Sequence, residues 1–394
     1  MKKIFDNAIS AGKLIFLSGL IRIFFKKKNL KKEVWLINEK IDEARDNGFA
    51  LFKYVRENHP EIPIYYVITK SSKDLSKIIP FGNVVYYGSI QHFILYLNAN
   101  VLISSQTLPY PIGRRLSELL SFCRLKDPKK VWLQHGIIKD KLPHSSMDYA
   151  TFQYDLISCS AAQEKNFIIN EYNYPEKNVV NVGLCRFDTL LSDISENVSI
   201  IVMPTFRKWL VPNKRIPTKL EIENFKESDF FKKYTQLLNA LANQINDVEI
   251  IFYMHYGLQP FSECFEQKFG NNPKIIIAKS EDYDVQKLLV SSNLLITDYS
   301  SVFFDFAYMK KPEIYFQFDQ NEYRKNHYNE GYFSYAKNGF GNVVVDVEDV
   351  IVEVKNSLEN GMSEIYIERV NNFFSHFDRN NSERTFERIK SLLH

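Results

Sequence analysis

The chain reads Leu294-Leu295-Ile296-Thr297-Asp298-Tyr299-Ser300-Ser301-Val302-Phe303-Phe304-Asp305-Phe306, and this stretch joins a short apolar strand to a polar turn and an amphipathic helix. Such a junction exposes the free backbone N–H groups of a helix start, which carry about half a positive charge and favour an anion. One hydroxyl would be enough to cap the helix. The run of hydroxyls therefore predicts several donors for a phosphate, and a capped helix without a ligand explains the segment equally well.

Short apolar runs alternate with longer helical patterns on both sides of this stretch. Their apolar character is continuous, which predicts strands covered on both faces and therefore parallel α/β sheets. One series of strands is expected at 34–37, 64–68, 84–87, 101–103, 131–133 and 179–182, and a second at 198–203, 250–254, 275–278, 294–296 and 314–316. The pattern breaks near residues 191–197, so the sequence predicts two doubly wound domains that face each other across a cleft, the GT-B architecture.

Composition is consistent with such a protein. The 394 residues are 45% hydrophobic and 14% aromatic, which is enough for two cores and excludes a disordered chain. The formal net charge of +3 is too small to indicate nucleic-acid binding. The cysteines lack metal-ligand spacing, so we expect buried thiols in a reducing compartment at Cys123, Cys159, Cys185 and Cys264.

The N-terminus combines apolar and basic residues. The uninterrupted apolar run at 14–21 is far shorter than the roughly 20 residues that span a bilayer, so a transmembrane helix is not expected. Five lysines follow within 26–32, and each lysine near anionic lipid contributes about 1 kcal/mol. We predict an interfacial, membrane-associated helix. The alternative is a helix packed on the core of the protein with a solvated lysine run.

Several chemically useful side chains follow predicted strands, where ligands of open α/β sheets bind. These residues are His135, Arg186, Thr205, His255 and Thr297. A histidine near neutrality can act as a general base, and one stands at a strand end in each predicted domain. Gly136 follows His135 and lacks a side chain, which permits close approach of a substrate.

Five segments, taken in this order, resemble one enzyme family. The segments are Leu133-Gln134-His135-Gly136-Ile137-Ile138-Lys139, Val182-Gly183-Leu184-Cys185-Arg186-Phe187-Asp188, Met203-Pro204-Thr205-Phe206-Arg207, the stretch 297–306, and Lys311-Pro312 with Phe318-Asp319 and Tyr323. With them the chain resembles the CDP-glycerol glycerophosphotransferases of teichoic-acid and capsule assembly, over residues 35–345. The resemblance also implies GT-B architecture.

The resemblance implies transfer of glycerol phosphate from CDP-glycerol to a hydroxyl of a lipid-linked or polymeric glycan acceptor, with release of CMP. Residues 1–32 would form the interfacial helix and basic cluster, 33–194 an acceptor-side α/β domain, and 195–394 a nucleotide donor-binding α/β domain. The enzyme would work at the cytoplasmic face of the bacterial membrane as a peripheral protein, without a cofactor or nucleic acid. The sequence does not distinguish a primase from a polymerase.

By resemblance His135 is the base, while His255 and the polar residues around it hold the pyrophosphate. The residues expected to bind substrate are Gly136, Arg186, Asp188, Thr205, Arg207, Thr297, Asp298, Ser300, Ser301 and Asp305. An internal pair of Arg186 with Asp188 explains these two residues equally well. The chain departs from the family pattern at Gln134, where many members carry threonine, and after His255, where His-Pro is expected.

We expect no bound metal, because the one compact acidic pair, Asp282-Tyr283-Asp284, begins a helical pattern and no Gly-rich phosphate loop or Cys/His cluster is present. Three alternatives stay open: a CDP-ribitol donor, a GT-B glycosyltransferase that uses a nucleotide sugar, and an inactive nucleotide-binding scaffold of an envelope assembly complex. Release of CMP with a new phosphodiester would support a phosphotransferase that uses CDP-glycerol or CDP-ribitol. A new glycosidic bond would support the glycosyltransferase.

Overall fold

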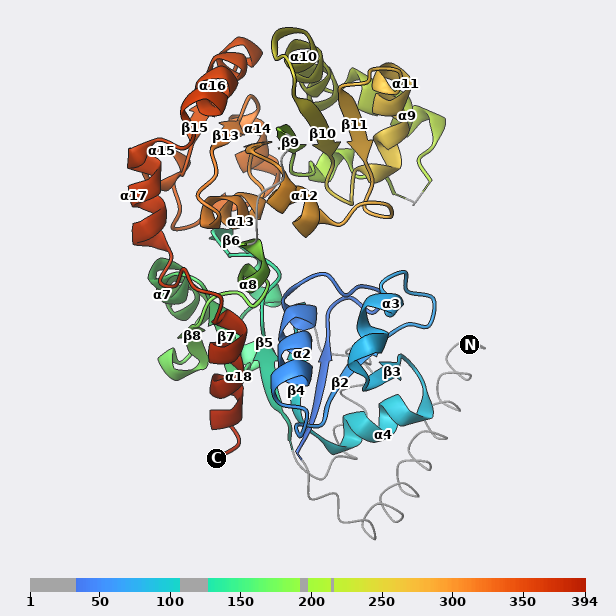
Figure 1. Ribbon diagram of the computed structural model, residues 1–394, viewed down its shortest axis with the longest axis vertical. Coiled ribbons are helices and arrows are strands. Elements are labelled where there is room, and N and C mark those ends of the chain that lie inside the picture. The colour runs from blue at the N-terminus through green and yellow to red at the C-terminus, as the bar shows by residue number, and fades with distance from the viewer. Residues whose placement is uncertain (1–32, 107–126, 192–197, 214–215) are drawn as a thin grey trace.

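A computed structural model describes residues 33–106, 127–191, 198–213 and 216–394. These residues form two α/β domains, each built on a parallel sheet (Figure 1). This confirms the two parallel-sheet domains expected from the sequence. The predicted N-terminal helix and Cys123 lie outside the described residues. Among the described helices, none is long and apolar enough to cross a membrane.

The first domain contains a parallel sheet in the order β3-β2-β1-β4-β5-β7-β8. Its central strands are continuous apolar runs that are buried along their whole length, as for β1 with the sequence VWLIN. Chain order reverses between β1 and β4, which makes this the switch point where ligands of open sheets bind. The strands are β1 (Val34–Asn38), β2 (Ile64–Ile68), β3 (Val84–Tyr86), β4 (Ala99–Ser104), β5 (Lys129–Trp132), β7 (Leu156–Cys159) and β8 (Val179–Asn181).

Helices cover both faces of this sheet. Helix α2 contributes Leu51, Phe52 and Val55 to the core on one face, and α4 and α7 contribute Tyr96, Ile168 and Tyr172 on the other. The helices are α2 (Asn47–Asn58), α3 (Leu75–Ile78), α4 (Ile90–Asn98), α6 (Tyr149–Phe152), α7 (Ala162–Tyr172) and α8 (Phe187–Leu190), with short 3-10 turns η1 (Ile79–Phe81), η2 (His144–Ser146) and η3 (Glu176–Asn178).

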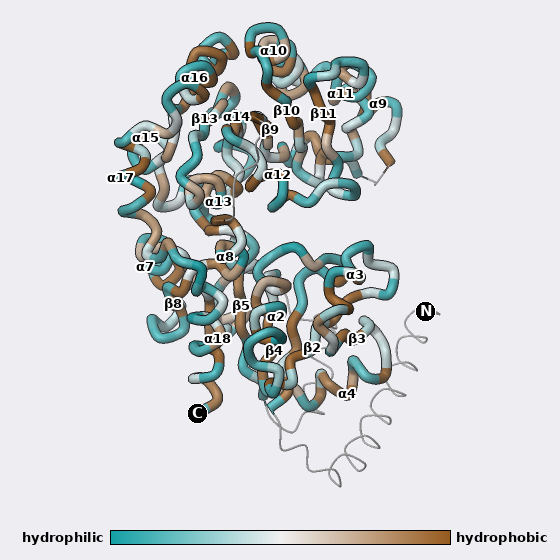
Figure 2. Tube along the Cα trace, viewed as in Figure 1, coloured by the Kyte–Doolittle hydropathy of each residue, from teal (hydrophilic) through white to brown (hydrophobic). Residues whose placement is uncertain are grey.

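The second domain contains a parallel sheet in the order β11-β10-β9-β12-β13-β15, with its switch point between β9 and β12. Figure 2 shows hydrophobic residues concentrated in the strands of this sheet. The strands are β9 (Ser199–Met203), β10 (Glu249–Tyr253), β11 (Ile275–Ala278), β12 (Leu294–Thr297), β13 (Glu313–Phe316) and β15 (Asn342–Val344). The helices are α9 (Lys219–Glu227), α10 (Asp229–Gln244), α11 (Ser262–Phe269), α12 (Val285–Ser291), α13 (Val302–Tyr308), α14 (Gln320–Asn326), α15 (Tyr335–Asn338), α16 (Val347–Asn360) and α17 (Glu364–Phe373), with 3-10 turns η4 (Lys208–Leu210) and η5 (Gln259–Phe261).

The predicted strands are all present to within a few residues, and three strand features were missed. Strand β7 was missed because Ser158 interrupts its short apolar run, and β15 because its three residues are partly exposed. The third is a two-stranded antiparallel link in which β14 (Asn329–Glu330) of the second domain pairs with β6 (Asp140–Lys141) of the first. Pairing between segments so distant in sequence leaves no local signal.

The two domains share a hydrophobic core around α8 and α13. The Phe187 ring on α8 stacks on the Tyr308 ring on α13, with ring centroids 4.3 Å apart. Leu184 and Leu190 belong to the same buried cluster as Phe303 and Phe304. This core places the strand ends of one domain against those of the other.

Helix α18 (Asn381–Ser391) follows the second domain in the chain but packs on α2 of the first domain. Phe386 of α18 is buried against Trp35, with ring centroids 5.7 Å apart. Asp188 accepts hydrogen bonds from the backbone N–H groups of Asn381 at 2.8 Å and Ser382 at 2.9 Å, at the start of α18. The carboxylate thus stabilises the free N–H groups of this helix start.

Candidate functional site

Residues that follow strands of the first sheet contact residues that follow strands of the second. Gly136 follows β5 and lies against Ser301, which follows β12: a methyl group at Gly136 would lie only 2.9 Å from Ser301 Oγ. Lys40 follows β1, and its Nζ lies 4.7 Å from the ring centroid of Tyr256, which follows β10. We call this region the interdomain site.

The backbone before His135 adopts an uncommon conformation. Gln134 has a φ of 60°, a left-handed value that is costly for a residue with a side chain. Two hydrogen bonds hold it there: Gln134 Nε2 donates to the Ser158 carbonyl at 2.5 Å, and Asn47 Nδ2 donates to the Gln134 carbonyl at 2.8 Å. This turn directs the chain so that His135 is exposed at the interdomain site instead of continuing β5.

His135 is neutral at physiological pH. Although the side chain is solvent-accessible, the protein around the ring removes much of its water, and this desolvation, with the positive charges of Arg186 and Lys40, lowers the pKa of His135 to about 4. A neutral imidazole can accept a proton, which is the requirement for a general base.

His255 follows β10 and lies near enough to His135 for the charge of His135 to act on it. Desolvation, Lys40 and His135 lower the pKa of His255 to about 4. The Gly257 backbone N–H donates to His255 Nδ1 at 3.2 Å, so the neutral ring carries its proton on Nε2. The ring also stacks on Phe206, with centroids 4.5 Å apart. His255 therefore presents a hydrogen-bond donor from a fixed ring.

Arg207 was expected to bind phosphate, and the structure places it among protein partners. Its side chain is fully buried, and Nε and Nη2 bind the Asp319 carboxylate at 2.6 Å and 3.0 Å. Nη1 lies 2.9 Å from Asp298 Oδ2 and donates to the Thr205 carbonyl at 2.7 Å. The guanidinium is thus occupied by protein partners, and its role is to hold the turns after β9 and β12.

Thr297 and Asp298 are likewise occupied within the protein. Thr297 Oγ1 donates to the Met203 carbonyl at 2.7 Å, which ties β12 to β9. Asp298 Oδ1 accepts from the Thr205 N–H at 2.8 Å, and Oδ2 accepts from the Tyr234 hydroxyl at 3.1 Å. Both residues were expected to bind substrate, and both instead shape the turns that would carry the substrate-binding groups.

Three hydroxyls remain near these turns. Ser300 and Ser301 are half-buried, and Ser301 makes no capping hydrogen bond although it stands before the first residue of α13. Ser300 Oγ accepts only a long bond of 3.4 Å from the Val302 N–H. Thr205 Oγ1 is buried without a hydrogen-bond partner. Hydroxyls in this condition gain a partner when a ligand with acceptor oxygens arrives.

One interpretation of the sequence was that Arg186 and Asp188 pair with each other. The structure shows that they do not. Arg186 instead binds Asp305 on α13 through Nε at 2.6 Å and Nη2 at 2.8 Å, and Asp46 through Nη1 at 2.9 Å. Asp188 is bound to α18, as described above. Arg186 and Asp305 are both buried, so the two residues join the domains and do not offer free groups to a substrate.

The sequence analysis missed Lys40 and His327. Lys40 follows the first strand in the same way that His135 follows β5, and this position at the switch point was the signal that could have identified it. Both ring nitrogens of His327 are buried without hydrogen-bond partners, and its ring lies 4.7 Å from that of Phe206. Desolvation, with Lys208 and Arg207, lowers the pKa of His327 to about 3.

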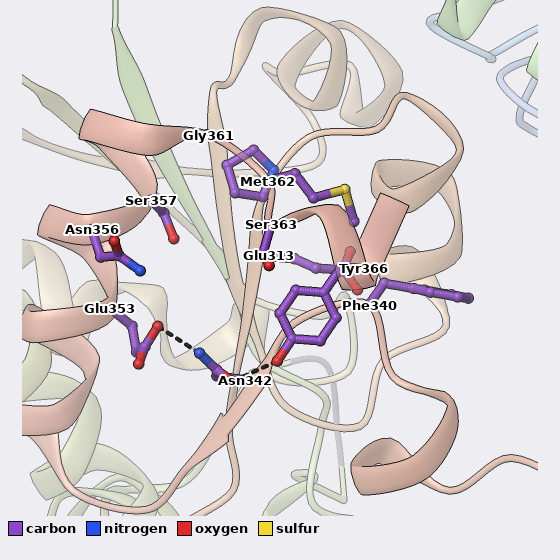
Figure 3. A pocket seen from close by; sticks show the side chains of 11 residues that line it. Glu313, Phe340, Asn342, Glu353, Asn356, Ser357, Gly361, Met362, Ser363 and Tyr366 are labelled. Carbon is purple, nitrogen blue, oxygen red and sulfur yellow. Dashed lines mark hydrogen bonds between the residues drawn. The ribbon is translucent and has the colours of Figure 1, made fainter. Parts of the chain in front are cut away.

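Three further features lie away from the interdomain site or serve the fold. A polar hollow between β13, β15, α16 and α17 is lined by Glu313, Asn342 and Tyr366 (Figure 3), and it contains none of the predicted site residues. Asp284 of the acidic pair is the N-cap of α12 and binds Lys77 of the first domain at 2.8 Å. Cys159, Cys185 and Cys264 are buried free thiols, as predicted.

Comparison with known proteins gives one consistent result. The sequence model of the family described as CDP-Glycerol:Poly(glycerophosphate) glycerophosphotransferase matches residues 20–391. The minor teichoic acid biosynthesis protein GgaB of Bacillus subtilis (strain 168) is 32% identical over 97% of this chain and 42% of its own length. The teichoic acid poly(glycerol phosphate) polymerase of the same strain is 26% identical over 78% of this chain and 42% of its own length. The chain therefore spans less than half the length of these two relatives.

A solved structure of the wall teichoic acid polymerase TagF superposes over 100% of both chains with a TM-score of 0.69 at 18% identity, which shows a common fold. A putative UDP-N-acetylglucosamine 2-epimerase from Listeria monocytogenes gives a TM-score of 0.58 at 14% identity, covering 92% of this chain and 97% of the other. Because the family match spans most of the sequence and includes both histidines of the interdomain site, the chain belongs to the CDP-glycerol:poly(glycerophosphate) glycerophosphotransferase family.

Proposed function

We propose that this chain transfers glycerol phosphate from CDP-glycerol to a hydroxyl of a lipid-linked or polymeric glycan acceptor in teichoic-acid or capsular polymer synthesis. One observation supports this most directly: two neutral histidines, His135 and His255, come from different domains to one site. Family membership supports the choice of donor. In this proposal the fold is GT-B, the first domain (33–194) binds the acceptor, and the second (195–394) binds the nucleotide donor.

His135 is the proposed general base. It takes the proton of the acceptor hydroxyl while the hydroxyl oxygen attacks the phosphorus that carries glycerol. A new P–O bond forms, the bond from this phosphorus to the bridging oxygen breaks, and CMP leaves with the electron pair of that bond. His135 then gives its proton to solvent. Such a displacement depends on in-line positioning and on stabilisation of the charge on the phosphoryl oxygens.

The second domain supplies the proposed donor site. The His255 ring is fixed by Phe206 and Gly257, and its Nε2–H would donate to the bridging oxygen that leaves with CMP. Hydroxyls of Thr205, Ser300 and Ser301 would bind the remaining phosphate oxygens. Arg207, Thr297 and Asp298 hold the turns in place, and Arg186 with Asp305 fixes the two domains against each other.

The proposed setting is the cytoplasmic face of the bacterial membrane, where a lipid-linked acceptor would be available. The basic cluster at 26–32 motivates this part of the proposal through its attraction for anionic lipid. Flotation of the full chain with anionic liposomes tests it, and charge reversal of the five lysines should reduce the bound fraction most at low ionic strength. Equal recovery with neutral and anionic liposomes would contradict it.

The donor is tested by incubating the chain with CDP-glycerol, CDP-ribitol or a nucleotide sugar, together with a lipid-linked disaccharide acceptor, and analysing products by mass spectrometry. CMP and a new glycerol phosphodiester are expected, with little effect of EDTA. His135→Ala should lower turnover by about 10²-fold or more while CDP-glycerol affinity is kept. His144→Ala, at an exposed histidine of the same domain, is the control. A new glycosidic bond would contradict the proposal.

A further inference from the structure

One lysine of the interdomain site, Lys40, is not held in a buried ion pair. Lys40 lies in the loop after β1, at the switch point of the first sheet, and its Nζ is 4.7 Å from the Tyr256 ring centroid in the second domain. Its ion pair is with Glu43 at 3.0 Å, between side chains that are 41% and 37% exposed. Exposed pairs of this kind contribute little to stability and exchange readily. The ammonium is therefore available to an arriving anion.

Four other cations near the site differ from Lys40, because each is already bound to one or more buried carboxylates. Arg186 binds Asp305 and Asp46, and Arg207 binds Asp298 and Asp319. Lys139 and Arg324 both bind Asp140, which joins β6 to the second domain. A phosphate cannot take these cations without leaving a buried carboxylate unpaired, which is strongly unfavourable.

The backbone that carries Lys40 is rigid. Glu39, next to it, is buried and accepts hydrogen bonds from the backbone N–H groups of Arg45 at 2.7 Å, Asp46 at 2.9 Å and Phe49 at 2.7 Å. Asp74 accepts a further bond from the Ala44 N–H at 3.0 Å. The loop is therefore preorganised, and only the flexible side chain of Lys40 has to move to meet a ligand.

We propose that Lys40 is a catalytic residue of the interdomain site, whose ammonium contacts the phosphate that is transferred and stabilises its charge between His135 and His255. This inference rests on the proposed function for the identity of the phosphate. The placement of Lys40 does not depend on that function, because an ammonium in contact with Tyr256 across the domains would attract any diphosphate bound there. The second domain would supply hydrogen-bond donors to the donor substrate, and the first domain would supply a full positive charge.

The charge of Lys40 has a measurable effect on the pKa values of two histidines, even without substrate. Its charge lowers the pKa of both His135 and His255; Arg186 acts on His135, while the charges of His135 and Asp298 act on His255. Lys40→Met keeps most of the side-chain length and removes the charge. The pKa values of both histidines, followed by NMR titration of their ring protons, should therefore rise in Lys40→Met and stay unchanged in Lys40→Arg.

Binding and turnover then test the contact with phosphate. Lys40→Met should lose about 10²-fold in kcat/KM for CDP-glycerol, the size found when one donor to a transition-state charge is removed. Lys40→Arg should restore a large part of this loss. Inorganic pyrophosphate should bind Lys40→Met more weakly than it binds the parent chain, as measured by calorimetry. Lys53→Met on α2, an exposed lysine paired with Glu57, is the matched control.

The outcomes separate the two proposals. If the parent chain does not bind CDP-glycerol but binds pyrophosphate through Lys40, CDP-glycerol is not the donor, and the role of Lys40 in binding phosphate is supported. If Lys40→Met keeps the parent's pyrophosphate affinity, or its kcat/KM with CDP-glycerol, the role of Lys40 is overturned even where the histidine pKa values move. Thermal unfolding of each variant shows whether a loss reflects damage to the fold, and equal loss with Lys40→Arg and Lys40→Met would also overturn the role of the charge.

Discussion

Arg186 holds both carboxylate oxygens of Asp305, through Nε at 2.6 Å and Nη2 at 2.8 Å, and so links the turn before α8 to helix α13 of the other domain. The guanidinium fork matches a carboxylate at two points, which fixes orientation as well as distance. Because Asp305 is on the helix that begins after Ser301, this pair sets where the Ser301 hydroxyl lies relative to the first domain.

Asp305→Ala should destabilise the protein strongly, because it leaves the buried Arg186 charge with only Asp46. Removing one partner of a buried pair costs about 3–5 kcal/mol. Thermal unfolding should show a lower Tm, and the double variant Arg186→Met/Asp305→Leu should recover much of the loss. Lys232→Ala, in an exposed pair with Glu227, is the control and should leave Tm unchanged. An unchanged Tm for Asp305→Ala would show that the pair does not hold the domains.

Arg207 and the serine pair should respond differently to substitution. Arg207→Met should lower Tm, because the carboxylates of Asp298 and Asp319 would stay buried without their cation. Ser300→Ala/Ser301→Ala should keep Tm and weaken CDP-glycerol binding, measured by calorimetry, since neither hydroxyl has a strong partner within the protein. Full donor affinity in the serine variant would remove these hydroxyls from the donor site.

The acid limb of the pH profile should lie unusually low. An unperturbed histidine would be half protonated near pH 6.5, whereas the pKa of His135 is lowered to about 4. The kcat/KM of the free enzyme should thus change little from pH 8 to pH 6 and fall as pH approaches 4. The same shift favours folding above pH 6.5, and this contribution is lost as pH falls through 4. Intrinsic fluorescence at each pH separates unfolding from protonation, and half-loss of kcat/KM near pH 6.5 in folded protein would contradict the assignment.

Gly136→Ala tests the close approach of the two domains. The added methyl group would lie 2.9 Å from Ser301 Oγ, so Ser301 has to move away from the site. We expect a lower kcat with a small change in Tm. Gly136→Ala/Ser301→Gly removes the colliding oxygen and should restore the approach, although it also lacks that hydroxyl. If Gly136→Ala is as active as the parent, the contact has no part in assembling the site.

The sequence predicted the sheets well because buried parallel strands are continuous apolar runs that any window of residues displays. It also located His135 and His255, since both directly follow such runs. It did not reveal the partners of Arg207, because a motif shows that an arginine is present and not that Asp298 and Asp319 converge on it from distant segments. Lys40 was passed over although it follows a strand at the switch point, because its contact with Tyr256 of the other domain is not visible in the sequence.

The assignment of helix α18 to a domain was limited in the same way, by contacts that are distant in sequence. The sequence analysis placed residues 195–394 in one domain from the break near residues 191–197, and so included α18 in the second domain. The return of α18 to α2 is fixed by tertiary contacts such as Phe386 with Trp35, and by Asp188 at its first turn. None of these contacts is local, so hydrophobic periodicity alone could not assign the helix to the first domain.

The placement of α18 has a consequence for synthesis of the protein on the ribosome. Trp35 and the α2 surface emerge early, but Phe386 and Ile389, which complete their core, are translated only after the entire second domain. The first domain therefore spends most of translation with an open apolar surface, a condition that favours chaperone binding or aggregation. Premature termination before residue 381 would leave the core of the first domain incomplete, although that domain is made first. The first domain can complete its core only after the second domain has been translated.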